Sequence, residues 1–160
     1  MARVTEPARR DTARALLFDE EGRLVLIRRT RPGWSPYLVT PGGAIEPGED
    51  SVQAVERECA EEVGAVVRVG PAVIVSPPDP RGTATFHLAV LDHIDLSLRT
   101  GHELSEPERG SYETVRLAWD DADALAMLRP PGVREALAEH GEAWAAWVAA
   151  VYLEGEEPRG

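Results

Sequence analysis

Residues 41–65, PGGAIEPGEDSVQAVERECAEEVGA, place seven acidic side chains within 25 positions. The stretch begins with a proline and two glycines, passes through the turn-like EPGED, and then takes on the periodicity of a helix. Like charges at helical spacing destabilise a helix by about 0.2–0.5 kcal/mol per pair. The segment therefore either leaves these carboxylates to solvent or holds a cation among them.

A helix is predicted from Ser51, which can cap its start, to about Val63, where Gly64 supplies a stop. At about 100° per residue, one apolar stripe faces the rest of the protein. The stripe consists of Val52, Val55, Cys59 and Val63. Cys59 is thus expected to be a small buried apolar residue rather than a reactive thiol.

Three carboxylates, those of Glu58, Glu61 and Glu62, project together from another side of this helix. A charge run of this kind is commonly a solvated face. Here the charges lie near the C-terminal end of the helix, where the helix dipole disfavours them. Ligand sets made of oxygen atoms select hard cations such as Mg²⁺, Mn²⁺ or Ca²⁺. The cluster is therefore a candidate metal site, with phosphate chemistry as its natural use.

The rest of the chain mixes strands and helices without regular alternation. A hairpin is predicted at residues 15–18 and 24–27, and helices at residues 120–130 and 133–153, the latter divided or bent at Gly141. Further strands are predicted at residues 37–40, 65–76, 83–96 and 111–119. This order favours an α+β fold with a mixed sheet between helices. We expect one domain at 14–153, a polar segment at 1–13 and a frayed tail at 154–160.

Composition narrows the functional classes. The 160 residues carry a net charge of −11, so a nucleic acid duplex is a poor partner. Cys59 is the single cysteine, which excludes an internal disulfide. No apolar run reaches 18 residues, and the first fourteen residues lack the apolar region of a signal peptide. The sequence thus predicts a cytoplasmic protein that does not enter the membrane.

Residues 43–65 resemble the Nudix box, G-x5-E-x7-R-E-U-x-E-E-x-G-U, in which U is an aliphatic residue. All seven fixed letters match, and the departures, Cys59 and Ala65, fall at U positions and remain apolar. The resemblance implies a Nudix-type α/β/α sandwich. It also implies metal-dependent hydrolysis of a nucleoside diphosphate linked to another group, which releases a nucleoside monophosphate.

By this resemblance, Glu58, Glu61 and Glu62 would bind the metal and carry the catalysis, with help from the carbonyl of Gly42 or Gly43. The cofactor would be Mg²⁺, with Mn²⁺ as the alternative. One of the three glutamates would act as the base for the attacking water. The resemblance leaves open which one.

Other box residues would have supporting roles. Arg57 would orient a neighbouring glutamate through a charge-assisted hydrogen bond and so belongs to the catalytic set. Glu49 would brace the loop against the helix. Gly43 and Gly64 would be required by the backbone geometry.

Residues outside the box are candidates for substrate binding. Arg28, Arg29 and Arg31 follow a predicted strand and would contact phosphates, or would be solvated strand ends. Trp34 and Tyr37 would stack on a base, or would serve as lid or core residues. A further acidic residue would come from a later loop, where Glu103, Glu106 and Glu108 are candidates alongside a plain surface role.

The substrate class stays open between a nucleoside triphosphate and an ADP-ribose-like compound. The chief alternative function is a Nudix-fold sensor that binds a nucleotide without turnover. It is disfavoured because every box glutamate is present. Isomerase chemistry on an isoprenoid diphosphate is a third hypothesis, and no residue outside the Nudix box points to it. Trp144 and Trp147 are expected in the core, although their helix would also suit a homodimer interface.

Overall fold

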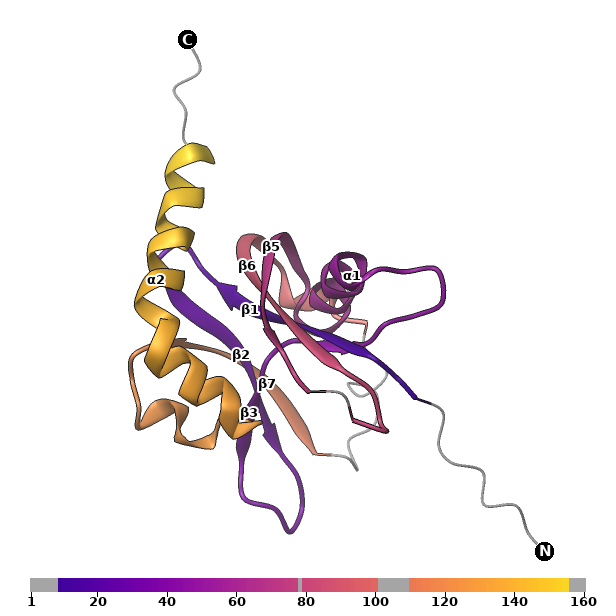
Figure 1. Ribbon diagram of the computed structural model, residues 1–160. Coiled ribbons are helices and arrows are strands. Elements are labelled where there is room, and N and C mark those ends of the chain that lie inside the picture. The colour runs from indigo at the N-terminus through magenta and orange to yellow at the C-terminus, as the bar shows by residue number, and fades with distance from the viewer. Residues whose placement is uncertain (1–8, 78, 101–109, 156–160) are drawn as a thin grey trace, which may run out of the picture.

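The computed structural model describes residues 9–77, 79–100 and 110–155. A mixed β-sheet lies between two helices, α1 (Ser51–Val63) and α2 (Pro131–Gly155), which cover its opposite faces (Figure 1). The predicted α+β sandwich is thus confirmed.

Seven strands form the sheet: β1 (Thr12–Phe18), β2 (Arg23–Thr30), β3 (Tyr37–Val39), β4 (Gly42–Ala44), β5 (Ala65–Val75), β6 (Ala84–Ile94) and β7 (Ser111–Ala118). The order along the sheet is β3-β2-β1-β6-β5, with β7 paired to β2 and β4 paired to β1. β1 and β6 run parallel, and the other pairs are antiparallel. The predicted strands are present, and β4 is an addition.

The two central strands β1 and β2 separate along their length. They pair at Phe18 and Leu24, next to the turn that joins them. Farther from this turn, β1 takes β4 as its neighbour and β2 takes β3. The sheet is therefore split between β1 and β2, and the short β3–β4 connection crosses the split.

Alternation along β1 divides the core into two layers. Leu16 and Phe18 point to the α2 side and join the larger core cluster. Ala15 and Leu17 point to the α1 side, where they join a core cluster with Val55, Cys59 and Val63 of the predicted stripe. Val52 is only partly buried, and Ala54 takes its place in this cluster. The small side chain of Ala15 lets α1 approach the sheet closely, which fixes the distance between the acidic helix and the strands.

The start of α1 differs from the prediction by one residue. Asp50, not Ser51, is the N-cap, because its side chain accepts a hydrogen bond from the backbone N–H of Gln53. The Gln53 side chain accepts in return from the Asp50 N–H, which completes a capping box. Ser51 instead contacts the Nε2 atom of the buried His87. The end of α1 is as predicted, with Gly64 in the left-handed conformation.

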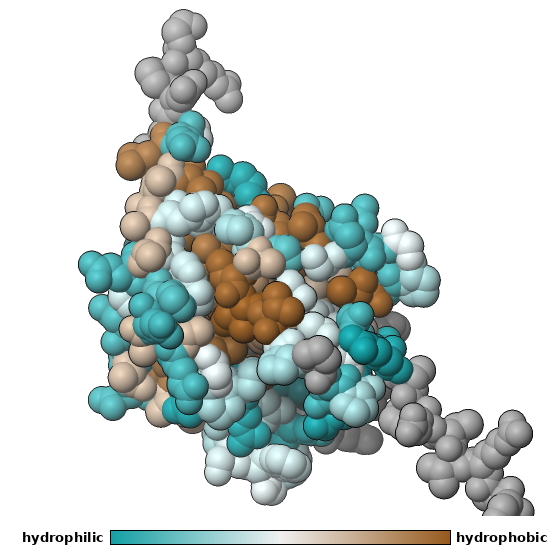
Figure 2. Space-filling view, viewed as in Figure 1, coloured by the Kyte–Doolittle hydropathy of each residue, from teal (hydrophilic) through white to brown (hydrophobic). Residues whose placement is uncertain are grey.

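The last helix, α2, begins at Pro131 and runs through Gly141 as one helix, so it is not divided there. The axis of α2 changes direction along its length, in line with the alternative expectation of a bend (Figure 1). A Cβ atom at Gly141 would lie 2.3 Å from the Trp119 ring, so this glycine serves close packing. Trp144 is buried in the core, as predicted. Trp147 lies over Gly70 of β5, and apolar side chains gather along this seam between α2 and the sheet (Figure 2).

The segment between β7 and α2 forms a short 3-10 helix, η4 (Ala124–Met127), and its N-cap Asp123 makes no side-chain cap. A second one, η1 (Leu96–Leu98), follows β6. Across the described ranges, no helix has the length and apolar character required to cross a bilayer.

The Gly64 turn provides a stability test. Gly64 has a φ of 64°, and an added Cβ would lie 1.9 Å from the Asp95 carbonyl oxygen. We expect Gly64→Ala to lower the free energy of unfolding by at least about 1–2 kcal/mol, the cost of a left-handed residue, before the clash is counted. Urea unfolding followed by circular dichroism measures it.

Gly132→Ala is the matched control. Gly132 lies in the first turn of α2, and nothing within 4 Å would obstruct a Cβ there. This variant should be neutral, or more stable by up to about 1 kcal/mol, because alanine favours helix. Equal effects of the two substitutions would contradict the assigned role of Gly64.

Candidate active site

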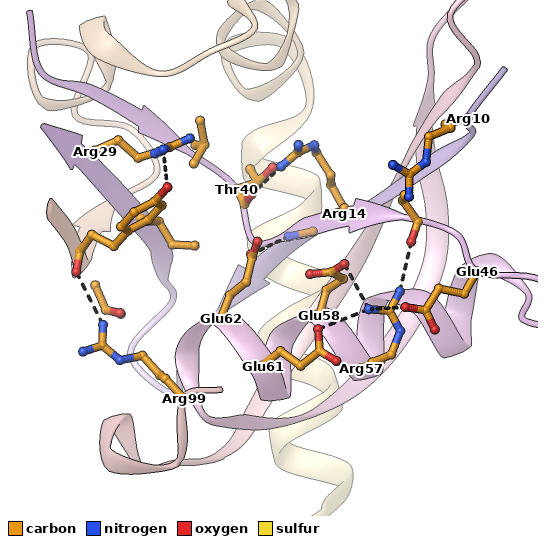
Figure 3. A pocket seen from close by; sticks show the side chains of 17 residues that line it. Arg10, Arg14, Arg29, Thr40, Glu46, Arg57, Glu58, Glu61, Glu62 and Arg99 are labelled. Carbon is orange, nitrogen blue, oxygen red and sulfur yellow. Dashed lines mark hydrogen bonds and ion pairs between the residues drawn. The ribbon is translucent and has the colours of Figure 1, made fainter. Parts of the chain in front are cut away.

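The acidic face of α1 borders a cavity of about 520 Å³ at the split between β1 and β2. Glu58, Glu61 and Glu62 line this cavity together with Gly42 and Gly43 (Figure 3). Residues that lie up to twenty positions apart in the sequence thus meet because β4 pairs with β1 directly beside α1.

Arg57 connects the glutamates of this region to one another. Its Nε and Nη2 atoms donate to both oxygens of Glu49, each at 2.9 Å. Its Nη1 atom donates to Glu58 at 3.1 Å and to Glu61 at 3.2 Å, and Nη2 also reaches the Ala44 carbonyl at 2.9 Å. One guanidinium therefore ties the loop, the strand and the helix together.

These contacts shift the pKa values of Glu49 and Arg57 in opposite directions. Hydrogen bonds from Arg57, and then the Glu46 N–H, lower the pKa of Glu49 to about 2. The hydrogen bond with Glu49 raises the pKa of Arg57 above its ordinary value, followed by Glu58, while burial opposes the shift. Both groups are thus charged throughout the neutral range.

Strand β4 distinguishes between the two predicted carbonyl ligands, those of Gly42 and Gly43. The Ala15 N–H donates to the Pro41 carbonyl and the Ile45 N–H donates to the Asp11 carbonyl, each at 2.8–2.9 Å. Because hydrogen-bonded pairs alternate in an antiparallel ladder, Gly43 belongs to the bonded set that faces β1. The backbone of Gly42 therefore faces away from β1 and leaves its carbonyl outside the ladder.

Two close approaches explain why glycines occupy this strand. A Cβ at Gly42 would lie 2.4 Å from the Arg14 side chain, and one at Gly43 would lie 2.4 Å from Glu58 Oε1. The backbone of Gly42 also contacts the helix, because its N–H donates to Glu62 Oε2 at 3.0 Å. Side chains at either position would displace groups that line the cavity.

The donor set fits a hard cation, although the carboxylates do not converge. Among the described residues, no three acidic, histidine or cysteine groups meet at the spacing of a metal site. Instead Glu58 and Glu61 contact Arg57, while Glu62 contacts Gly42. The candidate ligands thus share one wall, and small side-chain rotations would be needed to bring their oxygens together.

The cavity floor is the part of the sheet that α1 leaves uncovered. This helix packs on β1, β4 and β5. Side chains from β2, β3 and β7 continue the same face beyond the helix: Ile27, Arg29, Val39, Tyr112 and Thr114. The floor is therefore partly apolar and carries a guanidinium.

Only one of the predicted substrate residues reaches this cavity. Arg29 lines it, whereas Arg28 is exposed on the opposite face of the strand. Arg31 stacks on the exposed Trp34, 5.6 Å from its ring centre, outside the lining residues. Tyr37 is buried beside Arg129, whose guanidinium lies 4.7 Å from its ring centre.

Several lining residues escaped the sequence-based prediction. Arg10 and Arg14 come from the start of the sheet, Arg99 follows η1, and Tyr112 lies opposite Arg29. The sequence does give a signal for Arg14, because this charged residue interrupts an otherwise apolar run within β1. The candidates Glu103, Glu106 and Glu108 lie outside the described residues.

Cys59 lies under this site without joining it. The residue is fully buried against the sheet, as expected for part of the apolar stripe. Burial, followed by the charges of Glu62 and Glu58, raises the pKa of its thiol. A catalytic thiolate at this position is thus disfavoured.

Comparisons with known proteins agree with this architecture. The NUDIX domain model matches residues 8–139. The chain is 32% identical over 108 residues to an ADP-ribose pyrophosphatase of Methanocaldococcus jannaschii, which covers 65% of this chain and 64% of that relative. It is 29% identical over 121 residues to an uncharacterized Nudix hydrolase of Bacillus subtilis, which covers 70% and 66%. The chain thus spans just under two thirds of each relative's length.

A solved structure extends the agreement to the fold. A NUDIX hydrolase from Nitrosomonas europaea matches with a TM-score of 0.65 at 20% identity. The match covers 85% of this chain and 90% of that one. At this identity the similarity supports the fold alone.

The Glu49–Arg57 pair predicts a pH-dependent stability difference. Because folding lowers the Glu49 pKa from 4.5 to about 2, the ionised carboxylate stabilises the fold above pH 4.5, and this contribution is lost as the pH falls toward 2. We expect Glu49→Gln to lower the urea midpoint at pH 7, and the gap to the parent protein to narrow between pH 5 and 3. Glu56→Gln, an exposed change on α1, should show no such trend. A constant Glu49→Gln gap would contradict the assignment.

Proposed function

Because the chain belongs to the NUDIX family, we propose that it hydrolyses the diphosphate linkage of a nucleoside diphosphate joined to another group, with release of a nucleoside monophosphate. One observation carries the proposal. The three carboxylates of the box share a cavity with several arginines in a protein whose net charge is −11. That combination suits a phosphate-rich ligand accompanied by a cation.

We assign Glu58, Glu61, Glu62 and the Gly42 carbonyl as the residues that would hold a divalent cation, Mg²⁺ or Mn²⁺. When bound, such an ion would neutralise phosphate oxygens and make water easier to deprotonate. The fit rests on the chemistry of the donor set, which consists of oxygen atoms along one wall. Gly43 contributes by leaving room for Glu58.

The protein's own residues would orient the reaction. Arg57 would orient Glu58 and Glu61, and Glu49 would anchor Arg57 to the loop. One glutamate of the set would accept the proton of the attacking water. Arg14, whose Nη1 atom donates to the Thr40 carbonyl at 2.9 Å, would contact the diphosphate from β1.

The substrate class includes ADP-ribose and nucleoside triphosphates. The archaeal relative is named for ADP-ribose, which makes this compound the first to assay. Trp144 is buried against the sheet of its own chain and so does not supply an interface for a second subunit. A homodimer therefore stays a prediction.

Substitution of one carboxylate tests the catalytic assignment. Glu62→Gln should reduce turnover by at least about 100-fold, the usual contribution of a catalytic acid or base, while the thermal unfolding midpoint stays within a few degrees. The control Glu56→Gln alters an exposed carboxylate of the same helix and should keep full activity. Retained turnover in Glu62→Gln would exclude the assignment.

A substrate screen tests the reaction itself. Phosphate-containing products should appear from ADP-ribose, sugar nucleotides, dinucleoside polyphosphates or nucleoside triphosphates in the presence of Mg²⁺ or Mn²⁺, and a chelator should abolish them. Nucleotide binding without product from any compound would instead support the sensor function.

A further inference from the structure

The arginines of the cavity differ in how their charge is balanced. Arg57 contacts several carboxylates. The four others that line the cavity, Arg10, Arg14, Arg29 and Arg99, form no ion pair with the described residues. The described part of the chain thus supplies no carboxylate to pair with these four guanidinium groups, which leaves them available to an anionic ligand.

Two of these arginines flank a single tyrosine. Arg29 Nη2 donates to the Tyr112 hydroxyl, and the guanidinium carbon lies 4.3 Å from the centre of the Tyr112 ring. Arg99 Nη1 lies 3.4 Å from the Tyr112 carbonyl oxygen, and its Nε donates to the Leu96 carbonyl at 3.1 Å. Figure 3 shows Arg29 and Arg99 on the same side of the glutamates, with Arg10 on the other. We call Arg29, Tyr112 and Arg99 the cationic flank.

The register of β2 and β7 places different residue types across from two neighbouring arginines. Arg28, which points to the opposite face, lies across from Glu113. Arg29, which points into the cavity, lies across from Tyr112. An acidic residue opposite Arg29 would neutralise its charge, whereas tyrosine positions the guanidinium by stacking and leaves its charge available.

One donor of Arg29 has no partner within the described ranges. Arg29 Nε is buried without a hydrogen-bond partner among the described residues. A guanidinium carries five N–H donors in a planar array, which suits phosphate oxygens. Because contacts with Tyr112 and Leu96 already restrict both side chains, binding an anion would cost little conformational entropy.

We propose that the cationic flank binds a phosphate group that the substrate carries beyond the diphosphate to be cleaved, and so determines substrate preference. This inference rests on the proposed function, since it takes the carboxylate wall as the place of cleavage. The extra phosphate has two chemical sources. It is the third phosphate of a nucleoside triphosphate, or a phosphate monoester on the distal sugar of an ADP-ribose-like compound.

The test compares three substrates that differ in this group: a nucleoside triphosphate, ADP-ribose with a phosphate on its terminal ribose, and unmodified ADP-ribose. Arg29→Gln and Arg99→Gln should each lower kcat/KM about tenfold for a phosphate-bearing substrate, mainly through KM, because a charge-assisted hydrogen bond is lost. For unmodified ADP-ribose the change should stay below about twofold. The phosphate-bearing substrate that loses activity identifies the source.

Arg28→Gln is the matched control, because it removes the same charge from the next residue of β2 on the other face of the sheet. It should leave all three substrates unaffected. Equal losses for phosphate-bearing and unmodified substrates, or no loss in Arg99→Gln relative to Arg28→Gln, would overturn the proposal.

A binding measurement separates this inference from the proposed function. Calorimetric titration with inorganic tripolyphosphate, with and without Mg²⁺, should show weaker affinity in Arg29→Gln and Arg99→Gln than in Arg28→Gln, in proteins with matched unfolding temperatures. If the parent protein cleaves none of the substrates, the proposed function fails, and this titration still decides whether the cationic flank binds phosphate. Equal affinity in all variants would overturn the inference.

Discussion

The guanidinium of Arg57 is the contact on which the arrangement of the site depends. It binds the loop through Glu49, the strand β4 through the Ala44 carbonyl, and its own helix through Glu58 and Glu61. Lysine would not replace it, because a single ammonium lacks the planar set of donors that reaches both Glu49 oxygens while binding the other acceptors. Without this cation, neighbouring carboxylates on α1 would repel one another, and the loop would lose its link to the helix.

The second constraint is geometric. A helix of 13 residues is about 20 Å long, and it cannot cover a sheet whose central strands diverge. Helix α1 lies over β1, β4 and β5, so the same face of β2 and β7 stays open beside it. The split that weakens pairing between β1 and β2 thus produces the cavity. The acidic helix forms its wall, and the uncovered strands form its floor.

Local patterns carried most of the prediction from sequence. The spacing of Val55, Cys59 and Val63 places the apolar stripe on the sheet, and the spacing of the three glutamates places them together on an adjacent side that lines the cavity. Gly64 ends the helix because glycine readily adopts the left-handed conformation found there. These features depend on residues a few positions apart, so they can be predicted from the sequence alone.

Features that depend on distant pairing escaped prediction. The residues of β4, two glycines and an alanine, have no strand propensity, and they form a strand because β1 pairs with them. One local feature also escaped prediction: the choice of Asp50 over Ser51 as the N-cap follows from which side chain meets the Gln53 N–H, since both residue types cap well. Tyr112 and Arg99 reach the cavity through the pairing of β7 and the turn after β6.

The cavity has opposite charges on two sides, and this asymmetry constrains how any ligand lies in it. At physiological ionic strength, screening acts over about 8 Å, so acidic residues elsewhere on the surface hardly affect a ligand held in contact with the cavity. Phosphate oxygens beside Glu58, Glu61 and Glu62 would be repelled unless a cation lies between them. Phosphate oxygens beside Arg29 and Arg99 would be attracted directly. A polyphosphate that contacts both the glutamates and the arginines therefore has one favourable orientation. The charge pattern, rather than the shape of the cavity, selects which diphosphate linkage of the ligand faces the glutamates.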